Sequence, residues 1–147
     1  MTHDLRVESV YAAAPETVFD AFTDPQAQRE MYADEPGWIV RSECDVREGG
    51  RWTIEFGPPD ARPSRETCVF EVVDRPRRLV YRSTMLLPDG SSVHTRTHVT
   101  FTGTADGQTR LTVSQSGFPA AGLRDEFTEG WGGILAGLSR AVAARTA

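Results

Sequence analysis

The stretch GFPAAGLRDEFTEGWGGILAGLSRAV, residues 117–142, decides the fold, because the spacing of its apolar residues becomes that of a helix. These apolar residues recur at intervals of three or four, which places them on one helical face. They are Leu123, Phe127, Trp131, Ile134, Leu138 and Val142. Acidic residues gather near the start of the stretch and arginines near its end, a distribution that opposes the helix dipole. The sequence therefore predicts one long amphipathic C-terminal helix.

Four glycines interrupt this predicted helix, at positions 130, 132, 133 and 137. A glycine inside a helix costs about 1 kcal/mol relative to alanine, so tertiary packing must recover that cost. Missing side chains leave room either for a cavity or for close contact with another backbone segment. Both explanations stay open at the level of the sequence.

The region before this helix has the alternation of a sheet. From Trp38 onward apolar residues recur at every second position for about eighty residues, interrupted by turn signals rich in glycine, proline and aspartate. The expected strands are 38–46, 51–56, 65–73, 78–87, 92–102 and 109–116, with a further one at 5–11. Because alternate side chains point to opposite sides of a strand, we expect an antiparallel sheet with one apolar face.

Two short helices are expected between the first strand and the rest of the sheet. Pro15 suits the first turn of a helix that ends near Thr23. Asp24 is a candidate N-cap for a second helix, with Pro25 at its first position, running to about residue 31 or 32. One strand, two short helices, six strands and one long helix make a single α+β domain over residues 1–147.

Composition excludes several classes of function. The chain has 147 residues, a net charge of -5 and a pI near 5.2, which argue against a nucleic-acid partner. All 16 basic residues are arginine, so lysine Schiff-base chemistry and lysine-dependent phosphate loops are excluded. No window approaches the roughly 20 apolar residues of a membrane span, and no signal peptide is evident. We expect a cytoplasmic protein whose two cysteines, Cys44 and Cys68, are free thiols.

No constellation of residues predicts catalysis or metal binding. His94 and His98 stand about 13 Å apart on one strand, too far to share a metal, and they alternate away from the apolar face. Glu55 also alternates away from that face and is expected to be a surface charge. Among the inward-facing residues none has a required acid–base role, so no catalytic residue, metal or cofactor is predicted, and a binding protein is favoured over an enzyme.

Four segments resemble the activator of heat-shock protein 90 ATPase homologue family, of the START-like or Bet v 1-like (SRPBCC) superfamily. They are APETVFDAFTDP at 14–25, REGGR at 47–51, THVTF at 97–101 followed by GQTRLTV at 107–113, and EGW at 129–131 leading to Leu138. The resemblance covers nearly the whole chain. It implies a helix-grip fold, in which a curved antiparallel sheet of about seven strands wraps around the long C-terminal helix. Members often carry a tryptophan pair after the second short helix, where this chain has Met31 and Tyr32.

The resemblance leaves function broad, since the family spans uncharacterised bacterial proteins, hydrophobic-ligand binders, cyclase-like members and a eukaryotic co-chaperone domain. Our leading hypothesis is a small aromatic or lipid-like ligand held between the sheet and the C-terminal helix. Mainly apolar walls with a few polar groups are typical of such pockets. The candidate ligand-binding residues are Trp38, Ile54, Phe56, Phe70, Tyr81, Met85, Thr97, Gln115, Phe127, Trp131 and Ile134. Tyr81, Gln115 and Trp131 would orient the ligand.

Two other functions stay open. A polyketide cyclase or aromatase would fold a reactive chain in the pocket, with Tyr81 as the nominated proton-transfer group. A protein-interaction module would bind a chaperone or another protein, as the co-chaperone relative does. The candidate residues could also fill a dry core, with no pocket at all. A homodimer could form through a sheet edge or the short helices, but no sequence feature requires one.

Overall fold

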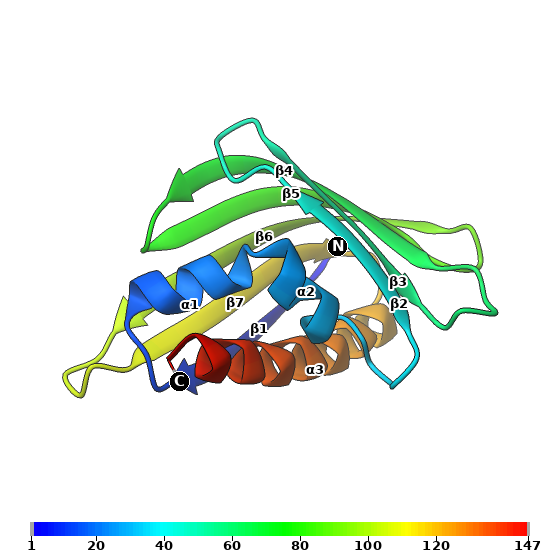
Figure 1. Cartoon of the computed structure of the whole chain (residues 1–147). Coiled ribbons are helices and arrows are strands. Elements are labelled where there is room, and N and C mark those ends of the chain that lie inside the picture. The colour runs from blue at the N-terminus through cyan, green and yellow to red at the C-terminus, as the bar shows by residue number, and fades with distance from the viewer. Residues whose placement is uncertain (1, 147) are drawn as a thin grey trace.

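A computed structural model describes residues 2–146. The elements, in chain order, are β1 (His3–Tyr11), α1 (Pro15–Phe22), α2 (Pro25–Met31), β2 (Ile39–Cys44), β3 (Arg51–Gly57), β4 (Ser64–Asp74), β5 (Arg78–Leu86), β6 (Ser92–Gly103), β7 (Thr109–Phe118) and α3 (Ala121–Thr146). The strands form one antiparallel sheet in the order β1-β7-β6-β5-β4-β3-β2, which arches over α3 (Figure 1). The predicted α+β class and helix-grip arrangement are confirmed.

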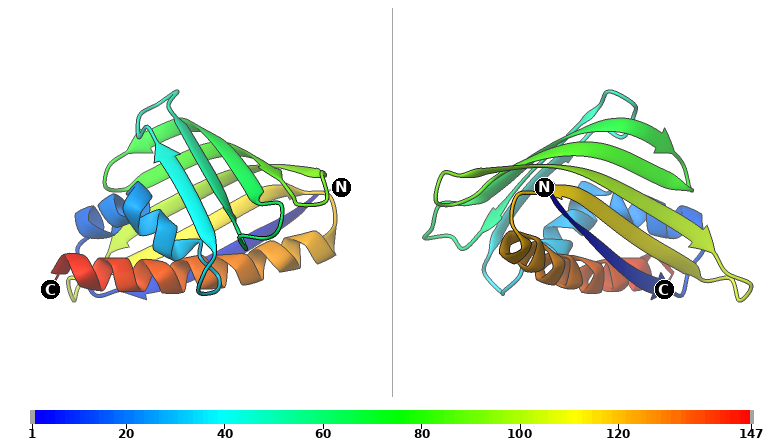
Figure 2. Two further views of the ribbon diagram at one scale, coloured as in Figure 1. Left: turned by 45° about the vertical axis from the view of Figure 1, so that its right-hand side comes forward. Right: turned by 180° about the vertical axis from the view of Figure 1, so that it is seen from behind.

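The alternation read from the sequence gives the sheet its two faces. In β5, Leu79, Tyr81, Ser83 and Met85 are buried against the helices. In β6, His94 is exposed and His98 half-buried on the opposite, outer face, as predicted. Burial, together with the charges of Arg78 and Arg96, lowers the pKa of His98. Figure 2 shows the curvature of the sheet around its inner, concave face.

The turn between β2 and β3 is shaped by its two glycines. Gly49 has a φ of +80°, in the left-handed region where residues with a Cβ are strained. A Cβ on Gly50 would collide with the carbonyl oxygen of Asp45. The turn therefore closes early, and β2 ends at Cys44, two residues before the predicted end.

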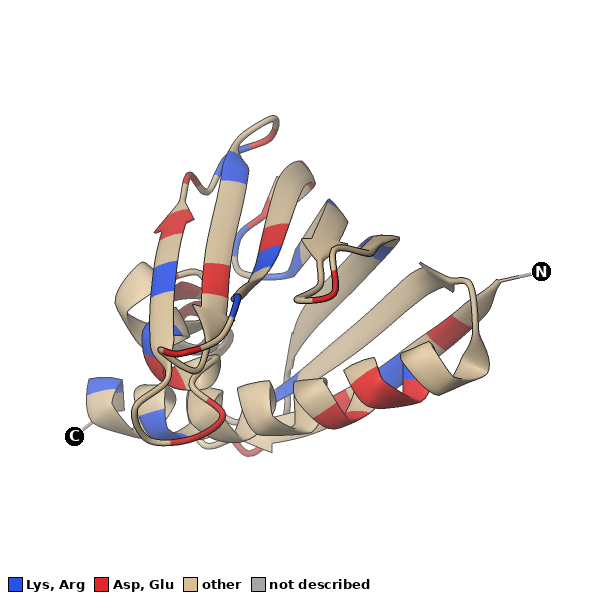
Figure 3. Cartoon of the chain, turned by 90° about the vertical axis from the view of Figure 1, so that its right-hand side faces the viewer, with Lys and Arg blue, Asp and Glu red and all other residues tan. Residues whose placement is uncertain are grey.

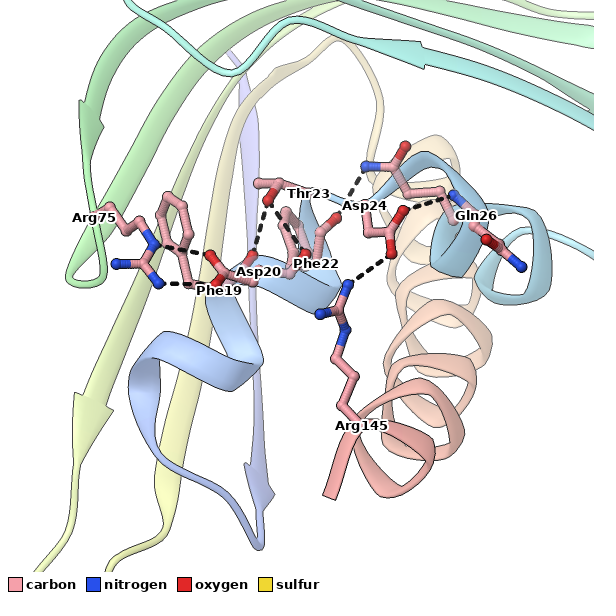
Figure 4. A network of polar contacts seen from close by, with 9 residues as sticks. Phe19, Asp20, Phe22, Thr23, Asp24, Gln26, Arg75 and Arg145 are labelled. Carbon is pink, nitrogen blue, oxygen red and sulfur yellow. Dashed lines mark hydrogen bonds and ion pairs between the residues drawn. The ribbon is translucent and has the colours of Figure 1, made fainter. Parts of the chain in front are cut away.

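The two short helices begin and end where the sequence predicts. Asp24 accepts a hydrogen bond from the backbone nitrogen of Gln26 at 3.0 Å, which caps α2 (Figure 4). Asp20 of α1 receives two hydrogen bonds of 2.8 Å from the Arg75 guanidinium, in the turn between β4 and β5. Beside this charge the pKa of Asp20 is lowered. These contacts fix the helix pair against one end of the sheet.

The second half of α3 is anchored at three points. The Tyr11 hydroxyl donates to the carbonyl oxygen of Leu135 at 3.0 Å. Gly137 lies directly against the backbone of Met31 in α2. Near the C-terminus, Arg145 pairs with Asp24 at 2.6 Å (Figure 4). By contrast, no residue of 121–130 in the first part of α3 is buried.

Aromatic side chains form the core beneath the short helices. Trp52 of β3 lies parallel to Phe70 of β4, with ring centroids 6.5 Å apart. Phe22 of α1 meets the edge of Trp52 at 6.1 Å, and its ring is parallel to that of Trp131 at 6.5 Å. Helices α1 and α2 thus cover only part of the concave face. The uncovered part faces α3 and holds the candidate site.

Candidate ligand-binding cavity

A cavity of about 430 Å³ lies between the sheet, α3 and the segment that follows α2. Small-molecule sites are usually clefts of about 300–1,000 Å³, so the volume is sufficient for a small ligand. The walls are largely apolar. The sheet contributes Phe56 and Met85, and the loop after β5 contributes Leu87. Helix α3 contributes Phe127, Trp131 and Ile134, and the segment after α2 contributes Tyr32, Ala33 and Trp38.

The structure brings seven of the predicted ligand-binding residues into this wall. They are Trp38, Phe56, Met85, Gln115, Phe127, Trp131 and Ile134. These residues come from five elements or loops far apart in the sequence, namely the segment after α2, β3, β5, β7 and α3. Hydrophobic periodicity alone places their side chains on the inner side of the sheet or helix.

The other four predicted residues are absent from the cavity wall and lie in the packed core. They are Ile54, Phe70, Tyr81 and Thr97, each at most 2% exposed. Tyr81 packs edge-on against Trp52 and Phe70 at 5.5 and 5.9 Å. These four residues share the inward orientation of the cavity residues, but the aromatic core fills the space beside them.

A hydrogen-bonded chain ties the Trp131 ring to the sheet. The Trp131 Nε1 donates to the Gln115 Oε1 at 2.8 Å, and the Gln115 Nε2 donates to the Thr95 Oγ1 at 2.9 Å. Gln115 is only 2% exposed, and burial strengthens the need for each of these partners. Trp131 therefore has a fixed orientation in the wall, and the Gln115 amide is already occupied by protein groups.

Glu66 in β4 is one of several cavity residues that are absent from the predicted set. Its side chain lines the cavity although the residue is 6% exposed, and the Ser83 hydroxyl donates to its Oε2. Burial raises the pKa of Glu66, against a smaller lowering by the Ser83 hydrogen bond. Glu66 is thus a titratable group on the cavity wall, which the predicted set of inward-facing residues did not contain. Glu66 and Phe70 are four residues apart on the same strand, so their side chains point to the same face of the sheet. That spacing was the sequence signal that could have placed Glu66 on the inner face.

The glycines of α3 have two different roles. Gly130 and Gly133 line the cavity, where a side chain would take up its space. At Gly137 a Cβ would stand 2.7 Å from the Met31 Cα, closer than real Cβ atoms approach. Gly132 does neither, since it is absent from the cavity wall and nothing lies within 4 Å of the position of its Cβ. Both explanations left open by the sequence therefore hold, at different glycines.

Charged residues surround the cavity unequally. Asp34 and Glu126 line it together with Glu66, whereas Arg140 is the basic residue among its lining. Figure 3 shows acidic residues along the first part of α3.

Within residues 2–146, no three potential metal-ligating side chains come close enough to hold an ion. Among the helices of the same range, none is long and apolar enough to cross a membrane.

Comparison with known families agrees with this architecture. The family described as "Activator of Hsp90 ATPase homolog 1-like protein" matches residues 12–143. The chain belongs to this family. Met31 and Tyr32, which stand where the resemblance led us to expect a tryptophan pair, both line the cavity. Tyr32 packs against Phe56 at 5.2 Å and Trp52 at 6.2 Å.

Solved structures share the fold of this chain. A protein from Rhizobium loti is 25% identical, with a TM-score of 0.81 over 96% of this chain and 97% of that one. A protein from Chromobacterium violaceum is 24% identical, with a TM-score of 0.81 over 95% and 96% of the two chains. A protein from Mycobacterium smegmatis is 20% identical, with a TM-score of 0.76 over 93% and 88%. No curated protein matches the sequence.

Proposed function

We propose that this protein binds a small hydrophobic molecule in the cavity between the sheet and α3. The observation that carries the proposal is the cavity of about 430 Å³ with its aromatic and aliphatic walls. Residues that merely filled a core would leave no such space, because protein interiors are close-packed. The Gln115 hydrogen bond that fixes Trp131 supports it further, since a preorganised wall loses less entropy on binding.

Native mass spectrometry of the purified protein, followed by thermal denaturation with a library of apolar compounds, tests this proposal. A ligand at one hundred times its dissociation constant stabilises the folded state by about 2.7 kcal/mol. For a chain of this length that corresponds to a rise in Tm of roughly 5–10 °C. Mass equal to that of the bare chain, with no compound raising Tm, would refute ligand binding.

Two matched glycine substitutions locate the binding site. At both positions no atom lies within 4 Å of a Cβ, but Gly130 lines the cavity and Gly132 does not, so only Gly130→Leu adds a side chain there. Both substitutions raise helix propensity equally. We expect the first to weaken ligand binding at least tenfold and the second to leave it unchanged. Equal affinities in the two variants would place the ligand outside the cavity.

A second candidate function is acid–base catalysis of the cyclase type, which Glu66 favours. It is a titratable group on the cavity wall, and Tyr32 lines the same cavity. Tyr81, the nominated catalyst, is buried outside the wall and becomes a weaker candidate. Unchanged turnover of a cyclisable polyketide-like substrate in Glu66→Gln would exclude this mechanism. Binding without conversion would leave the protein a carrier.

The proposal also includes a cytoplasmic location. Cys44 and Cys68 are free thiols, as is usual in reducing compartments. Fractionation of the source cells tests this directly.

A further inference from the structure

We propose that the ligand is an apolar molecule carrying a protonated amine, and that Glu66 binds the amine inside the cavity. This inference rests on the proposed function and adds the chemical class of the ligand.

The first observation is that Glu66 has no protein cation as partner. A buried carboxylate normally pairs with an arginine, because an isolated buried charge is costly. None of the ion pairs formed within residues 2–146 includes Glu66. No arginine contributes to the pKa of Glu66, which is set by burial and by Ser83. Burial thus favours the neutral form of Glu66, and a cation that enters the cavity would supply the counter-charge for its ionised form.

The second observation is the free hydrogen-bonding capacity of the Glu66 carboxyl group. The Ser83 hydroxyl donates to Oε2, and no side chain or backbone group of residues 2–146 donates to Oε1. An ionised carboxylate accepts hydrogen bonds through both oxygens. Because Glu66 lines the cavity, Oε1 is available to a donor on the ligand. A protonated amine supplies both that donor and the missing positive charge.

The third observation is the charge of the remaining wall. Asp34 and Glu126 add two further carboxylates, and Gln115 has both amide atoms engaged with protein groups. Arg140 is the one basic residue among the described lining, against three carboxylates. The excess of acidic groups disfavours ligands such as fatty acids, whose own carboxylate would be repelled. It favours cations at the cavity.

Calorimetric titration with decylamine, decanol and decanoate tests the inference, because the three probes share one apolar chain and differ in their charge. We expect decylamine to bind at least tenfold more tightly than decanol, the increment expected of a charged hydrogen bond, and decanoate to bind most weakly.

The variants Glu66→Gln and Glu55→Gln form a matched pair on adjacent strands. Glu55 lies on β3 with its side chain on the outer face, away from the cavity. In Glu66→Gln we expect decylamine to lose its tenfold advantage while decanol still binds. In Glu55→Gln we expect the wild-type order. Decanol binding also reports that the Glu66 variant is folded.

Each other outcome contradicts a defined part of the argument. Equal affinities for decylamine and decanol in the wild-type protein would overturn the amine inference and leave hydrophobic-ligand binding intact. An amine preference that survives Glu66→Gln but disappears in the double variant Asp34→Asn, Glu126→Gln would assign the selectivity to the cavity mouth and overturn the role of Glu66. Failure of all three probes to bind would count against the proposed function itself.

Discussion

Gly137→Ala is the substitution with the clearest structural consequence, because it adds one methyl group between two helices. The new Cβ would stand 2.7 Å from the Cα of Met31 and 3.3 Å from its backbone nitrogen. Ordinary van der Waals contact begins at 3.4 Å, so α2 and α3 must separate by more than half an ångström. Because the Met31 atoms are backbone, no rotation of a side chain relieves the clash.

The net effect is the difference between two opposing contributions. Replacing a helical glycine by alanine favours the helix by about 1 kcal/mol. Overpacking a closely packed contact costs about 1–3 kcal/mol, and here the contact is with backbone, which places the cost at the upper end. We expect a net loss of about 1–2 kcal/mol in the free energy of unfolding. For a chain of this size that lowers Tm by roughly 2–8 °C.

The control is Gly132→Ala, which changes the same residue type in the same helix. Nothing lies within 4 Å of a Cβ at position 132, so the helix-propensity gain should appear in full, as a stabilisation of about 1 kcal/mol. Urea denaturation followed by far-ultraviolet circular dichroism measures both variants. If Gly137→Ala were as stable as Gly132→Ala, the close approach of α2 and α3 would be refuted.

Three further predictions concern the titratable groups and the helix ends. Burial raises the pKa of Glu66 above its ordinary value of 4.5, so the folded protein holds this proton more tightly than the unfolded chain does. The stability attributable to Glu66 therefore falls as the pH rises from the pKa of the unfolded chain through that of the folded protein. Glu66→Gln should therefore raise the free energy of unfolding at neutral pH, and this gain should vanish toward pH 4.5. Urea titrations at several pH values measure the gain. A gain independent of pH would contradict the raised pKa of Glu66. Burial raises the pKa of Cys44 to about 12 and that of Cys68 well above its ordinary value. Iodoacetamide should therefore label neither thiol in the folded protein at mildly alkaline pH. Mass spectrometry before and after urea counts the adducts, and rapid labelling of the native protein would be inconsistent with burial of the two thiols. Asp24→Ala removes the α2 cap and the ion pair with Arg145, and should lower the free energy of unfolding by about 1–2 kcal/mol. Arg145→Ala removes the half-exposed ion pair alone and should cost less than about 1 kcal/mol in the same urea assay. Equal losses in the two variants would show that the cap contributes nothing.

The fold could be read from the sequence because each element carries its own local signal. Alternation separates Tyr81 from Arg82 on the two faces of β5, and Asp24 with Pro25 marks the start of α2. The strand ends depend instead on backbone geometry, such as the approach of Gly50 to Asp45, which no spacing rule contains.

The site was only partly predictable, because alternation along a strand tells which face of the sheet a side chain lies on but not which residues of other elements pack against it. Tyr81 and Met85 share the inner face of β5, yet Tyr81 meets Trp52 in the core and Met85 meets the cavity. Which part of the sheet α1 and α2 cover is a property of the assembled fold. Alternation along β4 places Glu66 on the same inner face as Phe70. Because a charged residue is seldom buried, its residue type favoured an exposed position instead, and the alternation was correct.

The three tryptophans lie in three different environments, which gives the protein separate optical reporters. Trp52 is 1% exposed in the core, Trp131 is held by Gln115 in the cavity wall, and Trp38 lines the same cavity while remaining half-buried. Emission from Trp52 should report unfolding, whereas emission from the other two should change when a ligand enters. The double variant Trp38→Phe, Trp131→Phe would follow folding alone, and Trp52→Phe would favour the binding signal.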